Sequence, residues 1–143
     1  MSPQQQTDRV VRIHLSIGWW SLVLFILLGT LLEVMHGLKL GFYLDVSNST
    51  RRLMWTLAHA HGTLIGLLHI AFAATTWAFG AGRWTRAPSA LMIAATILMP
   101  TGFFLGGVSV HSGDPSPLVL LVPPGALALL AAALLVARRC SRT

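Results

Sequence analysis

The chain has 143 residues, of which 55% are apolar and only 10% are charged, and its mean hydropathy of +0.71 does not suit a soluble domain of this length. Its formal net charge of +6 would fit nucleic-acid binding, but the basic residues form short clusters between apolar runs of about 20 residues, the length that crosses a bilayer. Composition and charge therefore argue against a soluble enzyme or a nucleic-acid-binding domain. They predict one small integral membrane unit embedded in the lipid bilayer.

Four apolar runs predict membrane-spanning helices over about 14–35, 53–79, 89–109 and 118–137. The polar residues before the first run are expected to fray, and His14, next to Arg12, is expected to be an ordinary interfacial residue. The segments between the runs are too short for a second domain. The predicted fold is all-α, a four-transmembrane-helix bundle that comprises residues 1–143 as a single domain.

Basic residues predict the orientation of this bundle. Lys39, Arg51 and Arg52 lie at the end opposite the termini, whereas seven arginines lie at the end with the termini: Arg9, Arg12, Arg83, Arg86, Arg138, Arg139 and Arg142. The positive-inside rule then places both termini in the cytoplasm and the loops 36–52 and 110–117 outside. The expected location is the cell inner membrane, as a multi-pass protein.

Prolines and glycines predict local features of the helices. Pro100 should kink the third helix, and the sequence 123–125, Pro-Pro-Gly, should bend or interrupt the fourth. The pairs Gly62–Gly66 and Gly102–Gly106 have the small-xxx-small spacing that lets helix backbones approach closely. We expect the second and third helices to pack through these two surfaces.

Three histidines interrupt the apolar second helix, because residues 58–69 read Ala-His-Ala-His-Gly-Thr-Leu-Ile-Gly-Leu-Leu-His. An ionisable group in hydrocarbon requires a partner, such as a metal, a haem, a proton path or a buried hydrogen bond. At about 100° per residue, His59 lies on the glycine face, His61 points nearly opposite, and His69 lies on the flank. The three are therefore separate positions, and a His-x-His pair on a regular helix cannot chelate one ion. For His69 a buried hydrogen bond fits better than a ligand role.

Several potential ligands fall in the outer half of the bundle when depth is counted at about 1.5 Å per residue. The candidate metal ligands are Glu33, His36, His59, His61 and His111. Imidazole and carboxylate suit copper, zinc or iron, and Glu33 with His59 is the pair closest in depth. The four acidic residues of the chain are too few for a complete di-iron site in one copy. For His36, His111 and Asp114, a solvated loop position is an equal alternative.

The stretch from Leu57 to Leu64 resembles the second helix of the catalytic subunit of haem–copper oxidases, where a His-Gly pair provides a haem ligand. The resemblance covers about a dozen residues and implies a haem ligand at His61. Independently of it, a haem between His59 or His61 and a histidine from another helix is feasible, so His59 is a further cofactor-binding candidate. The chain lacks the twelve helices and the copper-binding histidines of that family, so oxidase activity is not implied. In overall layout it is similar to small uncharacterised bacterial four-helix membrane proteins.

These observations leave three functions open. The first is a metal- or haem-binding membrane protein, with its site in the outer half, for electron transfer or metal handling. The second is a non-enzymatic accessory subunit of a larger membrane complex, or a homo-oligomer. The third is a proton-coupled transporter or channel protomer that uses His69 and His59 as relays. No nucleophile elbow, phosphate-binding loop or paired-cysteine motif indicates another enzyme class.

Overall fold

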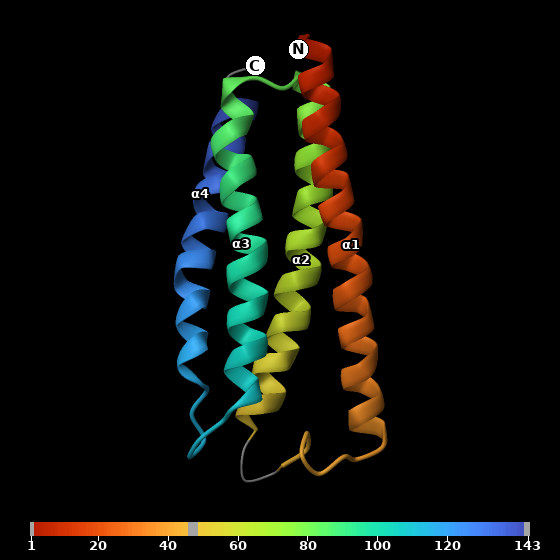
Figure 1. The fold of residues 1–143 in the computed structure, drawn as a ribbon, viewed down its shortest axis with the longest axis vertical. Helices are drawn as coiled ribbons and strands as arrows, with labels where there is room; N and C mark the ends of the chain where they lie inside the picture. The colour runs from red at the N-terminus through yellow and green to blue at the C-terminus, as the bar shows by residue number, and fades with distance from the viewer. Residues whose placement is uncertain (1, 46–48, 142–143) are drawn as a thin grey trace.

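The computed structural model describes residues 2–45 and 49–141, with Arg83 described by its backbone alone. Its elements are α1 (Pro3–Gly37), α2 (Thr50–Phe79), α3 (Arg83–Val108), the 3₁₀ turn η1 (Pro117–Leu121) and α4 (Val122–Cys140). Successive helices run in opposite directions, so both termini lie at one end of the bundle (Figure 1). We call this the termini end and the opposite one the loop end. Arg142, one of the arginines assigned to the cytoplasmic side, lies outside the described residues.

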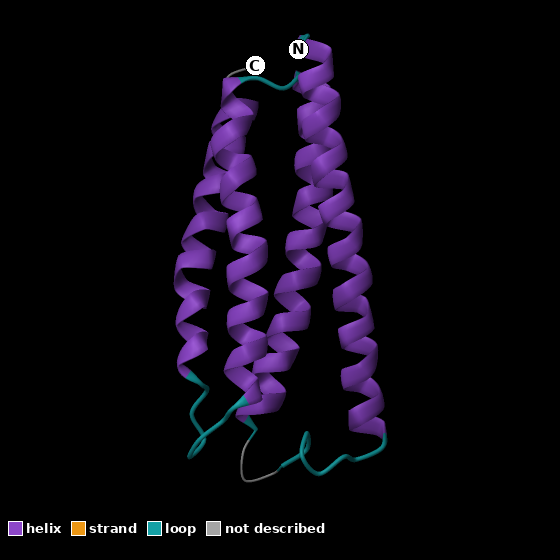
Figure 2. Ribbon diagram, viewed as in Figure 1, coloured by secondary structure: helices purple, strands orange, loops and turns teal. Residues whose placement is uncertain are grey.

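The described part of the chain contains four helical stretches that are long and apolar enough to cross a membrane. Helices fill almost the whole length of the molecule and loops are confined to its two ends (Figure 2). Large apolar side chains cover the outer surface, as the 71% exposure of Trp20 and Leu120 illustrates. Such a surface suits lipid rather than water. The predicted all-α, four-helix membrane architecture is confirmed.

The first helix begins at Pro3, well before the predicted start at residue 14. A capping box fixes this start: the Ser2 hydroxyl accepts the backbone N–H of Gln5 at 3.2 Å, and the Gln5 side chain accepts that of Ser2 at 2.8 Å. Pro3 occupies the first helical position, where its missing N–H has no cost. The expectation of a frayed N-terminus was therefore wrong.

Each helix packs mainly on its neighbours in sequence, α1 on α2, α2 on α3 and α3 on α4. A Cβ placed on Gly66 would lie 3.1 Å from the Gly18 carbonyl oxygen of α1, and one on Gly62 would meet the Phe25 ring. A Cβ on Gly102 would lie 2.9 Å from Val122 of α4. The prediction that α2 and α3 meet through both glycine pairs was wrong, because Gly62 and Gly66 contact α1. A Cβ on Gly106 would lie 3.3 Å from Val119 of η1 and 3.7 Å from Met54 of α2.

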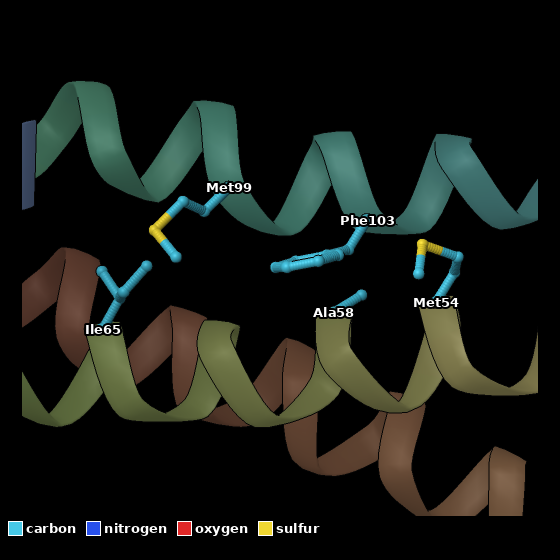
Figure 3. Packing of buried hydrophobic residues seen from close by; sticks show 5 residues of the cluster. All are labelled: Met54, Ala58, Ile65, Met99 and Phe103. Atoms are coloured by element: carbon cyan, nitrogen blue, oxygen red, sulfur yellow. The ribbon is translucent and has the colours of Figure 1, made fainter. Parts of the chain in front are cut away.

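The α2–α3 interface is instead filled by large apolar side chains. Met54, Ala58 and Ile65 of α2 face Met99 and Phe103 of α3, and all five are buried (Figure 3). A second cluster at the loop end contains Leu32, Met35 and Tyr43, and a third towards the termini end contains Phe72, Met92 and Ala132. The loop half of the bundle is thus packed with apolar atoms.

The prolines have different consequences on the two helices. α3 continues as one helix through Pro100, and the kink expected there stays a prediction. Pro123 and Pro124 lie in the first turn of α4, where backbone N–H groups need no helical partner. The chain changes from the 3₁₀ turn η1 to α4 just before them, but the two form one uninterrupted helical span, Pro117–Cys140, and the expected bend stays a prediction.

Candidate functional site

Two histidines from different helices contact each other in the interior of the bundle. The Nδ1 atoms of His14 on α1 and His69 on α2 lie 2.7 Å apart, and the rings stack at 23° with centroids 4.8 Å apart. Both side chains have 0% exposure. The expectation that His14 is interfacial was wrong, because the early start of α1 places residue 14 three turns inside the helix on the face that packs against α2.

The outer nitrogens of the pair contact hydroxyls on a third helix. His14 Nε2 lies 2.8 Å from Ser89 Oγ, and His69 Nε2 lies 2.7 Å from Thr96 Oγ1. Thr96 Oγ1 in turn lies 2.8 Å from the Met92 carbonyl oxygen. A continuous hydrogen-bonded chain therefore runs from Ser89 through both imidazoles to Thr96 and joins α1, α2 and α3.

The partners of this chain determine where its protons lie. The Thr96 hydroxyl donates to the Met92 carbonyl, so Thr96 Oγ1 accepts from His69 Nε2–H. His69 Nδ1 is then a lone pair that accepts from His14 Nδ1–H, and His14 Nε2 accepts from the Ser89 hydroxyl. In this first arrangement both imidazoles are neutral and every ring nitrogen has a partner.

The same heavy atoms also fit a reverse arrangement. If the Thr96 hydroxyl donates to His69 Nε2, then His69 Nδ1–H donates to His14 Nδ1, and His14 Nε2–H donates to Ser89 Oγ. Each ring again carries one proton. Passing from the first arrangement to the second moves one proton along the chain without rotation of either ring, so Ser89 must take up a proton from outside the chain and Thr96 must release one.

The pair belongs to a wider set of polar side chains inside the termini half. We call this set the polar column: Thr7, His14, Ser21, His69, Thr76, Thr85, Ser89 and Thr96. Among the described residues it includes every buried polar side chain except Ser116. Thr7, His14 and Ser21 recur every seven residues, which is about 20° short of two full turns, so they share one face of α1. The arrangement concentrates the buried polarity of the bundle along one line.

Towards the loop end, the polar column ends at Ser21, and apolar side chains follow. The Phe25 ring packs against Gly62, and Ile65 of α2 has 0% exposure. Towards the termini end the column continues as hydroxyls: Thr7 Oγ1 accepts the Ala81 N–H at 2.8 Å, and Thr76 Oγ1 is buried without a protein hydrogen-bond partner. The polar column therefore contains residues from the termini end to the middle of the bundle and does not extend through the loop half. It is not one continuous hydrogen-bonded chain, since Thr76 has no protein partner and the Phe72 ring packs on His14 with centroids 4.6 Å apart.

The two histidines of the His-x-His pair face different helices, as predicted. His59 Nδ1–H donates to the Phe25 carbonyl of α1 at 2.6 Å, and its ring lies over Gly29. His61 Nδ1–H donates to the Leu57 carbonyl at 2.9 Å. The His61 ring packs against Phe103 of α3, with centroids 4.9 Å apart. In both residues Nε2 is left as the lone pair that a metal would use.

The structure gathers only part of the predicted metal set. Glu33 and His59 line one cleft of about 360 Å³ near the loop end. His36 and His111 are exposed, and His111 exchanges two backbone hydrogen bonds with Asp114 across a turn. Within residues 2–45 and 49–141, no three His, Cys, Asp or Glu side chains are positioned to hold one metal ion.

Sequence reasoning identified His69 as a buried, hydrogen-bonded residue but missed its partners His14, Ser89 and Thr96. The signal was present in the spacing of Thr7, His14 and Ser21, which places three polar residues on one face of an apolar helix. The assumption that this helix starts at residue 14 hid the repeat.

Comparisons with models of protein families, with curated proteins and with solved structures find no match for this chain.

Proposed function

We propose that this chain is a membrane protein that transfers protons between the termini end and the middle of the bilayer. The observation that carries the proposal is the hydrogen-bonded chain Ser89–His14–His69–Thr96, in which the two Nδ1 atoms lie 2.7 Å apart. Two imidazoles in direct contact can each accept a proton at one ring nitrogen and release one at the other. Ser89 is the entry point on the side of the termini.

The surroundings of the pair support a relay role. The buried residues Thr7, Thr76 and Thr85 belong to turns of α1, α2 and α3 between the pair and the termini end. The distribution of arginines favours a cytoplasmic location for that end. Beyond Ser21 the interface between α2 and α3 is apolar, and the polar column does not continue into the loop half. A single chain of this kind is a half-path that delivers protons to a site at mid-membrane depth, rather than an open channel through the inner membrane.

Hydrogen exchange at the imidazoles tests this function. In bilayers, NMR follows the ring N–H groups of His14 and His69 after transfer of the intact protein to deuterated water. A relay connected to water predicts that the ring N–H groups exchange far faster than the backbone amides of the surrounding turns of α1 and α2. Ser89→Ala removes the entry hydroxyl and should slow the exchange about tenfold or more, whereas Thr75→Val, on the outer face of α2, should have no effect.

Two results would contradict the relay. One is ring N–H groups that are as protected as the neighbouring backbone amides, which would make the pair a static helix-packing contact. The other is an exchange rate that Ser89→Ala leaves unchanged while the fold is intact, which would remove Ser89 from the route. Circular dichroism of each variant provides the control for folding.

A second candidate function, metal or haem binding in the outer half, is favoured by the geometry of His59. The Phe25 carbonyl fixes its Nδ1–H, so Nε2 is available as a ligand in the cleft that Glu33 also lines. Two protein ligands are an incomplete set, so the site would require a second copy of the chain or a partner subunit. A visible spectrum and metal analysis of the protein purified in mild detergent test this function, and a colourless, metal-free protein would contradict it.

A further inference from the structure

A groove of about 580 Å³ separates α1 from α3 on the lipid-facing side of the bundle. Its lining residues all come from α1 and α3, and both of these helices pack on α2. The lining runs from Ser21 to Leu31 on α1 and from Thr96 to Leu105 on α3. At about 1.5 Å per residue, the groove extends for about 15 Å. It has the dimensions of an elongated ligand with a long apolar part.

The polar groups of this groove are concentrated towards the end nearer the termini. Ser21 and Thr96, both members of the polar column, lie there, whereas the remainder of the lining is apolar apart from Thr101. Thr96 is also the last residue of the proposed relay, since its Oγ1 lies 2.7 Å from His69 Nε2. The groove and the relay therefore share one side chain.

Thr96 offers hydrogen-bond acceptors to a ligand in the groove. In the first arrangement its hydroxyl donates to Met92 and accepts from His69, which leaves one lone pair of Oγ1. Pro100 also lines the groove, and it lacks the N–H that would bond the Thr96 carbonyl four residues earlier in the helix. Two acceptors at the polar end of an apolar groove suit a head group that donates O–H hydrogen bonds.

We propose that this groove binds a lipid-soluble hydroquinone, with its ring hydroxyl on Thr96 and its hydrocarbon tail along the apolar wall. The inference rests on the proposed function, because it places the exchangeable O–H of the ligand on Thr96, whose Oγ1 is hydrogen-bonded to His69. The ester and acyl parts of a phospholipid carry no hydrogen-bond donor and leave the acceptors of Thr96 unpaired, which distinguishes them from a hydroquinone. Phe25 and Phe104 provide aromatic surfaces in the lining.

Binding of decylubiquinol to the full chain in detergent tests the groove, measured by equilibrium dialysis under reducing conditions. We expect saturable binding that Thr96→Val weakens about fivefold to tenfold, the loss of one hydrogen bond. Leu24→Trp should abolish binding, because Leu24 lines the groove, is 59% exposed and can be enlarged without changing the core. Thr75→Val is the matched control, since Thr75 bonds its own i−4 carbonyl at 2.9 Å outside the groove.

The outcomes separate this proposal from the relay. Saturable binding with the expected order of variants supports the groove, even if ring-proton exchange shows that the relay is absent. No saturable binding, or binding that Leu24→Trp leaves unchanged, overturns the groove proposal and leaves the relay standing if the exchange results hold. Equal binding of the dimethyl ether of the probe, which lacks the O–H groups, or equal competition by a phospholipid, also overturns it.

Discussion

His14 and His69 form a direct imidazole–imidazole hydrogen bond, Nδ1 to Nδ1 at 2.7 Å, between two helices that are long and apolar enough to cross a membrane. Neither side chain is exposed, and each outer nitrogen has a hydroxyl partner on α3. Buried polar groups are costly unless all of their partners are present. Here four side chains from three helices satisfy one another, so the packing of α1, α2 and α3 and the proposed transfer of protons depend on the same contacts.

The energetic coupling of the two histidines is the first testable consequence. His14→Ala and His69→Ala should each destabilise the protein, since each leaves a buried ring nitrogen of the other residue unpaired, at a cost of about 1–3 kcal/mol. The double variant should cost less than the sum, with a coupling energy of about 1 kcal/mol as for other hydrogen bonds between membrane helices. Unfolding of the four proteins in mixed detergent micelles measures this. Strict additivity would show that the contact contributes nothing.

The contact between Gly62 and Phe25 gives a second prediction. A Cβ at position 62 would overlap the Phe25 ring, so Gly62→Ala should push α1 away from α2 and destabilise the bundle by about 2 kcal/mol. Gly41→Ala is the matched control, because Gly41 lies in a loop with no atom within 4 Å of the added Cβ. The same micelle unfolding assay applies. Equal stability of the two variants would be inconsistent with the observed α1–α2 packing.

The start of α1 leads to a third prediction. Ser2→Ala removes the hydroxyl that caps the helix and should cost about 1 kcal/mol, felt mainly as fraying of the first turn. Backbone hydrogen exchange of Gln5 and Gln6 should accelerate, since their N–H groups bond the side chain and carbonyl of Ser2. Ser16→Ala, at an exposed position in the middle of the same helix, serves as the control. Unchanged protection of Gln5 in Ser2→Ala would contradict the cap.

The groove next to Thr96 gives a fourth prediction, which concerns ligand-dependent stability. Decylubiquinol should raise the unfolding temperature of the wild-type protein, and above the dissociation constant the rise should increase with the logarithm of its concentration. Leu24→Trp should remove this shift because the larger side chain fills the groove. Stabilisation that is equal in the wild type and in Leu24→Trp would indicate that the probe acts on the surrounding micelle.

Hydropathy was sufficient to predict the four helices, because crossing a bilayer requires long apolar segments. The opposite orientation of His59 and His61 was also predictable, since it follows from the helical step alone. The residues of the capping box at Ser2 are present in the sequence, but the first helix was predicted to begin only at residue 14. His14 was therefore expected at the membrane interface and not in the interior. The partners of Gly62 and Gly102 could not be predicted, because small-xxx-small spacing indicates close approach without identifying the neighbour.

The contact between His14 and His69 depends on tertiary structure in the same way. The two residues are 55 positions apart in the chain, and their meeting requires the correct rotation of both α1 and α2 about their axes. The seven-residue spacing of Thr7, His14 and Ser21 predicts a polar face on α1, but not which helix covers it. Hydroxyl partners such as Ser89 and Thr96 carry no distinctive sequence signal, because serine and threonine are common in membrane helices.

The ¹⁵N spectrum of histidine-labelled protein in bilayers tests the proton relay most directly. The relay predicts neutral tautomers at His14 and His69 that exchange between the two arrangements. Thr96→Val should favour the arrangement with the proton on His69 Nδ1, and Ser89→Ala the one with the proton on His14 Nδ1, because a buried N–H without an acceptor is costlier than an unpaired lone pair. A single fixed tautomer pair in the wild type and in both variants would contradict the relay.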